Sequence, residues 1–237
     1  KAGKEGFVFT IFSIILTFVL GYFVSKLLKI EKKTSFLISG GTAICGGSAI
    51  AAIAPAIKAE EKQISVALGT IFILNSIALF VFPFVGHLVN LDASQFGLWC
   101  AIAIHDTSSV VGAAAKFGPE ALEVATTVKL ARALWIIPIS LLSIVLFKSK
   151  ESKVKIPYFI GLFVLAMLAN SYIPMVSQFS SYITTIAKIG LTITLFLIGT
   201  GLSMKVISSV GIKPLLLGII LWICISATSL WVILSMY

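Results

Sequence analysis

Two short polar stretches interrupt apolar parts of this chain and carry residue types that bind ions. The first is Gly46-Gly47-Ser48, with Thr42 one turn before it. Because glycine weakens a helix by about 1 kcal/mol relative to alanine, the glycine pair predicts a break. A helix that restarts after a break exposes N–H groups with partial positive charge, so we predict that these residues bind an anion. The alternative is that the glycines only let two membrane helices pack closely.

The second stretch is His105-Asp106-Thr107-Ser108-Ser109. A carboxylate inside a membrane segment costs about 2.5–3.5 kcal/mol on insertion scales and usually faces a cavity or an ion pathway. We therefore predict that Asp106 couples transport to H⁺ or Na⁺, with His105 as a second group that exchanges protons. The predicted substrate pocket is lined by His105, Thr107, Ser108 and Ser109. The alternative role for Asp106 is the N-cap of a helix, which is compatible with the first.

Lys129 and Arg132 follow the second stretch at a spacing that places them on one face of a helix. If that helix begins at Ala121, Arg132 lies about 16 Å along it, too deep for easy snorkelling to the interface. We predict that Arg132 binds the substrate, since a guanidinium donates two parallel hydrogen bonds to an oxyanion. Lys129 is predicted to take part in ion coupling by balancing Asp106. Snorkelling is the alternative for both cations.

The composition requires a membrane as the environment of these residues. The 237 residues are 59% hydrophobic and 11% charged, with a mean hydropathy of +1.10. Soluble domains carry about 25% charged residues, and this chain has too much apolar surface for water. The net charge of +9 comes mostly from lysines in short loops, as in other membrane proteins, and predicts no nucleic-acid partner. The three cysteines show no metal or disulfide spacing, so we expect no cofactor apart from Na⁺ or H⁺ as a coupling ion.

Six segments are long and apolar enough to cross a bilayer, which takes about 20 residues. They are Phe7–Leu28, Ile64–Val89, Ala121–Phe147, Ile156–Val176, Tyr182–Met204 and Pro214–Tyr237. Two further segments, Phe36–Ile57 and Phe96–Phe117, contain the polar stretches. If both are re-entrant, the first entering from the cytoplasm and the second from outside, the lysine-bearing loops share one side. The loops around Asn90 and Gln178 then lie on the other side. The alternative is that both segments are unwound helices that cross the membrane fully.

The two polar segments also resemble each other. A shift of 60 residues places "AICGGSAIAA" (Ala43–Ala52) over "AIHDTSSVVG" (Ala103–Gly112). Paired repeats with interrupted helices are typical of secondary transporters. The predicted fold is therefore an all-α polytopic membrane protein of inverted-repeat transporter type, with about six full spans and two broken or re-entrant segments.

Three motifs resemble the YeiH family of bacterial inner-membrane proteins, whose members are often labelled sulfate exporters. They are "GTAICGGSAIAAIAPAI" (Gly41–Ile57), "AIHDTSSVVGAAAKFG" (Ala103–Gly118) and "VKLAR" (Val128–Arg132). The resemblance covers nearly the whole chain, although Asp106 replaces the family's usual Glu and Ser109 stands where a Gln is usual. It implies a multi-pass inner-membrane transporter related to cation/proton antiporters and anion transporters. Family members usually carry about two more spans before the equivalent of Lys1, so we expect residues 1–237 to be one transporter domain without those spans.

The function predicted from these observations is secondary transport of a small anion, such as sulfate, sulfite or another oxyanion, coupled to H⁺ or Na⁺. The expected partners are that anion and the lipid bilayer, with a homodimer left open. We expect the chain not to be an enzyme. The alternatives are a cation/proton exchanger that uses Asp106, a membrane-embedded enzyme that uses His105 and Asp106, and a passive channel.

Overall fold

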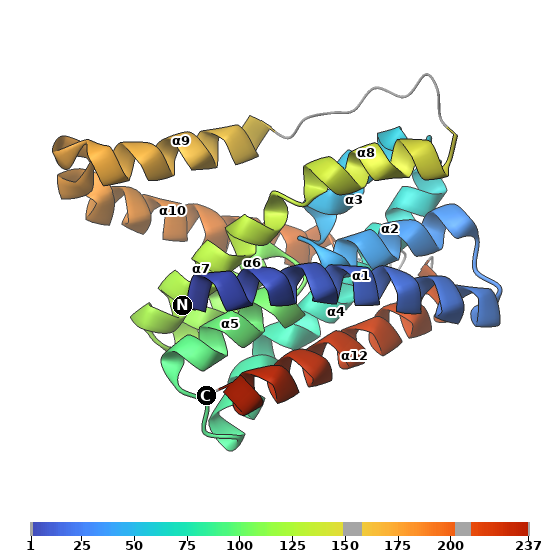
Figure 1. Ribbon diagram of the computed structural model, residues 1–237, viewed down its shortest axis with the longest axis horizontal. Coiled ribbons are helices and arrows are strands. Elements are labelled where there is room, and N and C mark those ends of the chain that lie inside the picture. Colours follow the sequence, from blue (N-terminus) through green and yellow to red (C-terminus); the bar gives the residue numbers. More distant parts are fainter. Residues whose placement is uncertain (1, 149–157, 202–209, 237) are drawn as a thin grey trace.

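The computed structural model describes residues 2–148, 158–201 and 210–236, and within these ranges all regular structure is helical (Figure 1). The helices are α1 (Ala2–Leu28), α2 (Lys32–Ala43), α3 (Gly47–Ala56), α4 (Glu61–Leu88), α5 (Ala93–Ala103), α6 (Thr107–Phe117), α7 (Pro119–Ala133), α8 (Ile136–Leu146), α9 (Tyr158–Tyr172), α10 (Pro174–Gly201) and α12 (Ile212–Met236).

Four stretches of the described chain are long and apolar enough to span a membrane. They are Thr10–Leu28, Glu61–Leu88, Pro119–Leu146 and Ile212–Ser235, which are most of α1, α4, α7 with α8, and most of α12. These four agree with four of the six predicted spans.

The third span is interrupted where α7 passes into α8. At this point the amides of Leu134 and Trp135 bond three residues back instead of four, to Ala131 and Arg132. Pro138 explains the interruption, because it has no N–H to donate to the carbonyl four residues earlier. Pro83, in contrast, lies inside α4 without ending it.

The segment Phe36–Ile57 forms a helical hairpin, α2–α3, and does not cross the molecule. Residues of the two arms that lie at increasing distance from the break face each other in matching order. A Cβ added to Gly41 would meet Ile50, and one added to Gly40 would meet Ile53. At the open end, Nζ of Lys33 donates to the carbonyl of Lys58 at 2.7 Å. Both ends of this segment therefore lie at the same end of the molecule.

The segment Phe96–Phe117 forms a second hairpin, α5–α6, which opens at the other end. The rings of Phe96 and Phe117, near the start of α5 and at the end of α6, stack with their centroids 3.8 Å apart. Ser94 Oγ also donates to Glu120 across the open end at 2.8 Å. The 28-residue helix α4 joins the two hairpins and is about 42 Å long at 1.5 Å per residue, so their open ends are far apart. Each of the two segments is thus a hairpin that opens at one end of the molecule, which is the shape of a re-entrant segment and not of a crossing helix.

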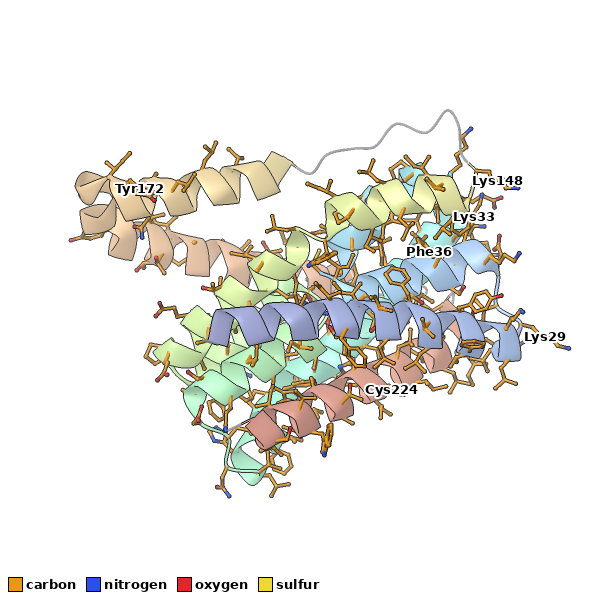
Figure 2. All side chains as sticks on the ribbon, viewed as in Figure 1. Lys29, Lys33, Phe36, Lys148, Tyr172 and Cys224 are labelled. Atoms are coloured by element: carbon orange, nitrogen blue, oxygen red, sulfur yellow. The ribbon has the colours of Figure 1, made fainter. Side chains whose placement is uncertain are left out.

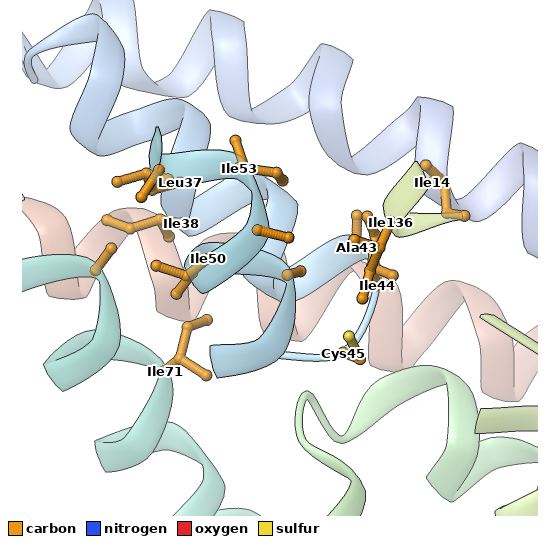
Figure 3. Close-up of a cluster of buried hydrophobic side chains, with 14 of the residues drawn as sticks. Ile14, Leu37, Ile38, Ala43, Ile44, Cys45, Ile50, Ile53, Ile71 and Ile136 are labelled. Atoms are coloured by element: carbon orange, nitrogen blue, oxygen red, sulfur yellow. The ribbon is translucent and has the colours of Figure 1, made fainter. Parts of the chain in front are cut away.

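The first hairpin is held by apolar side chains from several helices (Figure 3). Ile14 of α1, Ile71 of α4 and Ile136 of α8 pack around it and are at most 2% exposed. A second apolar cluster, which includes Phe82, Phe96 and Trp99, holds the α5–α6 hairpin against α4 and α12. Each hairpin is therefore covered by longer helices, as non-spanning backbone in a membrane requires.

The helices α9 and α10 lie side by side at one edge of the molecule (Figure 1), where α10 contacts α6 and α9 contacts α7. The chain turns at Ile173, and Pro174 begins α10, a position that suits proline because the first helical residue needs no N–H partner. The predicted loop around Gln178 is therefore wrong, since this residue lies within α10. Parts of the two predicted spans here, residues 156–157 and 202–204, lie outside the described residues, as do the lysines at 150, 153, 155 and 205.

Candidate functional site

The closed tips of the two hairpins meet at Gly46 and Asp106. A Cβ added to Gly46 would lie 3.1 Å from Cβ and 3.3 Å from Cα of Asp106. The arm α2 has 12 residues and is about 18 Å long, a little over half of a 30 Å hydrocarbon core. The two breaks, which lie 60 residues apart in the sequence, thus form one centre near the middle of the molecule.

The first break owes its shape to a glycine in a left-handed conformation. Gly46 has φ +63° and ψ −125°, which side chains strongly disfavour. Its amide donates to the carbonyl of Gly41 at 2.9 Å and so closes the last turn of α2. Gly46 is also the N-cap of α3 and, as a glycine, has no side chain to cap it, while the Cys45 thiol faces the backbone amide of Ala49. The N–H groups of Gly47 and Ser48 therefore carry the positive end of the helix dipole.

The second break is built around Asp106, which caps α6. One oxygen of its carboxylate accepts from the amide of Ser109 at 3.0 Å, and the other accepts from the Ser109 hydroxyl at 2.5 Å. The N-cap interpretation of Asp106 is thus confirmed, and its coupling role stays a prediction. The amide of His105, just before it, donates to Oδ1 of Asn75 on α4 at 3.1 Å.

Each buried cation of α7 binds the carbonyl end of the helix that precedes one break. Lys129 Nζ donates to the carbonyl of Ile104 at 2.7 Å and to that of Ala101 at 3.3 Å, at the end of α5. Arg132 donates through one terminal nitrogen to the carbonyl of Ala43, the last residue of α2, and through the other to Ser13 Oγ at 3.3 Å. Both side chains are 0% exposed. One helix face therefore neutralises the negative dipole ends of both broken helices.

The centre contains more buried positive than negative charge. Among the described residues, the Asp, Glu, Lys and Arg side chains that are buried are Asp106, Lys129 and Arg132. With both cations protonated and the carboxylate ionised, their formal charges leave an excess of one positive charge. Cys45, at the first break, lies within electrostatic range of all three. An uncompensated buried charge is expensive, so with this formal charge the centre would be stabilised by a further negative charge.

Several buried polar atoms around the centre have no hydrogen-bond partner among the described residues. They are Thr42 Oγ1, both ring nitrogens of His105, Nδ2 of Asn75, Nε of Arg132 and Nε1 of Trp222. The rings of His105 and Trp222 lie near each other, with centroids 6.4 Å apart. Buried polar groups are nearly always hydrogen-bonded in folded proteins, so this concentration of free donors marks the centre as a place for a polar ligand.

The structure brings most of the predicted site residues into this centre, but not all. Gly46, Asp106, Ser109 and Lys129 lie in it with the contacts given above. Ser108 is buried and Thr107 is half-buried in the first turn of α6. Ser48, in contrast, is exposed on α3, so its backbone N–H rather than its hydroxyl belongs to the exposed helix start.

Comparisons with known proteins show the family to which the chain belongs. Residues 1–218 match the family model described as Conserved hypothetical protein 698. A UPF0324 membrane protein of Bacteroides thetaiotaomicron is 56% identical over 231 residues, which are 97% of this chain and 70% of that protein. One from Photobacterium profundum is 52% identical over 233 residues, 98% of this chain and 72% of its own length. The chain belongs to the family of UPF0324 membrane proteins. No solved structure matches it.

Family membership and the four spanning helices together make this a multi-pass protein of the bacterial inner membrane. Within this UPF0324 protein, sequence reasoning missed three contributors to the centre. Ser13 and Trp222 gave no signal, since a serine and a tryptophan in apolar helices are common. Cys45 was considered only for metal and disulfide spacing. Its place inside "CGG" was the signal that could have assigned it to the break.

Proposed function

We propose that this chain forms the core of a secondary transporter that moves a small anion across the bacterial inner membrane, coupled to H⁺ or Na⁺. The observation that carries the proposal is that two cationic side chains, Lys129 and Arg132, and one carboxylate, Asp106, are buried where two hairpins from opposite ends touch. Interrupted helices that meet at the midplane are the usual substrate site of inverted-repeat transporters.

The anion is proposed to lie at the start of α3, bound by the free N–H groups of Gly47 and Ser48 and by Thr42 Oγ1. The hydroxyls of Thr107 and Ser108 extend the same site from the second hairpin. Arg132 contributes its unpartnered Nε and its charge, while one terminal nitrogen holds the end of α2 and the other donates to Ser13 of α1. A dianion such as sulfate or sulfite would then reach the centre with one compensating cation, H⁺ or Na⁺. We propose Asp106 and His105 as the groups that take up H⁺, whereas a Na⁺ at Asp106 would need further oxygen ligands.

The cation/proton exchanger is less well supported by the same geometry. Both carboxylate oxygens of Asp106 already accept hydrogen bonds from Ser109, and Lys129 lies nearby with a charge that repels cations. A cation site there would need other oxygen ligands, because Na⁺ and similar hard ions take several. We therefore propose anion transport and not cation exchange or enzymatic turnover.

The test is ligand-induced thermal stabilisation of the purified full-length protein with sulfate, sulfite, carboxylates and sulfonates, against NaCl and pH controls. An anion at one hundred times its Kd adds about 2.7 kcal/mol of stability, which a thermal shift detects. The decisive variant is Thr42→Val, because the hydroxyl that it removes has no partner in the described structure. We expect this variant to unfold at the same temperature as the wild type without anion and to lose most of the shift with anion. A shift produced only by Na⁺ or pH, and absent from Asp106→Asn, would overturn anion transport in favour of cation exchange.

A further inference from the structure

A second site lies away from the centre, in a groove at the lysine-rich end of the molecule. A cavity of about 790 Å³ opens between the end of α1, the start of α2 and the end of α8. Its volume falls within the range of about 300–1,000 Å³ that is usual for ligand sites. In Figure 2, Lys29 and Lys148 lie at this end of the molecule, with Phe36 set further in.

The outer part of the groove is basic. Four lysines line it, namely Lys26, Lys29, Lys32 and Lys148, and its lining contains no aspartate or glutamate among the described residues. Glu31 is the acidic residue next to it in sequence, and its carboxylate accepts from the side chain of Gln63 instead. Lys26 lies 5.2 Å from the centre of the Tyr22 ring. The groove therefore attracts a negatively charged group at its mouth.

The inner part of the groove is wholly apolar. A further cavity of about 220 Å³ is lined by Ile14, Ile15, Phe18, Val19, Phe36, Ile139, Leu142 and Leu146. Four of these, Phe18, Val19, Phe36 and Leu146, also line the basic part of the groove, so the two cavities are adjacent and share a wall. The Phe36 ring lies between those of Phe18 and Phe147, at 5.0 and 5.1 Å. A ligand that fills both parts needs an anionic head and a hydrocarbon tail.

We propose that this groove binds an anionic phospholipid, with its phosphate at the four lysines and one acyl chain in the apolar slot between α1 and α8. A free inorganic anion would leave the slot unfilled, and a neutral lipid would leave the lysines unpaired. The lysine-rich end faces the cytoplasm by the positive-inside rule, and anionic lipid lies in that leaflet. Basic pockets between helices on this side of a membrane are known to bind such head groups. This site is independent of the proposed anion transport.

The experiment compares binding of phosphatidylglycerol and phosphatidylcholine with identical acyl chains to the full-length protein in detergent, by native mass spectrometry. The groove variant is Lys29→Gln with Lys148→Gln. The matched control is Lys62→Gln with Lys116→Gln, which removes the same charge from exposed positions outside the groove. Each lysine near a head group contributes about fivefold, so the groove variant should lose roughly twenty-five-fold of its preference for phosphatidylglycerol and the control should keep it.

A third variant, Val19→Trp, tests the slot. We expect it to weaken binding of both lipids while the four lysines remain in place, and we expect inorganic phosphate not to compete with phosphatidylglycerol for the wild type. Equal loss of preference in the groove and control variants would overturn the proposal, because the lysines would then act only through net charge. The proposal would also be overturned if the wild type showed no preference for phosphatidylglycerol. This is the result expected if another protein segment fills the groove. Effective competition by inorganic phosphate would show an anion site without a lipid.

Discussion

Replacing Gly46 by alanine should destabilise the protein through the point where the two hairpins touch. The φ of +63° with ψ of −125° belongs to a region that is essentially reserved for glycine. The added Cβ would also lie 3.3 Å from Cα of Asp106 and 3.3 Å from Cγ2 of Ile71. The first of these is a backbone atom and cannot rotate away. The tips must therefore separate or the first break must change its shape.

The expected magnitude follows from these two costs. A residue held in a sparsely populated backbone region costs about 1–3 kcal/mol, and overpacking a filled interior costs about as much again. Together they predict a loss of roughly 2–6 kcal/mol. Each kcal/mol shifts the Tm of a protein of this size by about 2–4 °C. Gly46→Ala should thus lower the apparent Tm by at least about 4 °C.

The assay is thermal unfolding of the full-length protein in detergent, followed by tryptophan fluorescence at one scan rate because unfolding of such proteins is often irreversible. The neighbouring Gly47→Ala is the matched control. Gly47 has no positive φ, and a Cβ there would meet Phe72 and Leu68 at ordinary distances of 3.4–3.5 Å. Its apparent Tm should stay within about 2 °C of the wild type. Equal Tm values for the two variants would refute the tip contact as described.

The remaining predictions concern the charged residues of the centre. Arg132→Met should speed labelling of the native Cys45 by a membrane-permeant maleimide, and Lys129→Met should speed labelling of Cys100, since each cation holds one break. Losing a hydrogen bond from a charged group costs about 1.5–3 kcal/mol, which predicts a tenfold to hundredfold increase in rate at that cysteine. Equal acceleration at both cysteines in each variant would contradict this assignment. Asp106→Ala should lose about 1 kcal/mol of stability as a missing N-cap, whereas Asp106→Asn should keep it and lose only H⁺ or Na⁺ dependence of transport in proteoliposomes. If Asp106→Asn destabilises the protein as much as Asp106→Ala, the start of α6 is stabilised by the negative charge of the side chain and not by its hydrogen bond to the helix.

Much of this architecture could be predicted locally. Two interrupted segments in an all-helical membrane protein were indicated by local features. These were the lysine-poor and lysine-rich loops, the glycines at 46 and 47 and the acidic residue at 106. These features can be recognised within a short stretch of sequence. The composition of a segment decides whether it lies in lipid, and glycine pairs and N-caps affect the helix within one turn. The boundary near Gln178 was wrong for a related reason. Apolar helices on both sides of Ile173 leave almost no contrast in hydropathy, and only Pro174 marks where the second begins.

Tertiary structure decided how the charges are used. From the sequence, Lys129 and Arg132 were free to bind substrate, to snorkel or to balance Asp106. In the folded chain they bind the carbonyl ends of α5 and α2, helices that precede them by more than 25 residues. The contact of Gly46 with Asp106 is equally invisible in the sequence, because it depends on two hairpins entering from opposite ends to the same depth. Local chemistry thus determines where the helices break, whereas only long-range packing determines that the two breaks meet beside two buried cationic side chains.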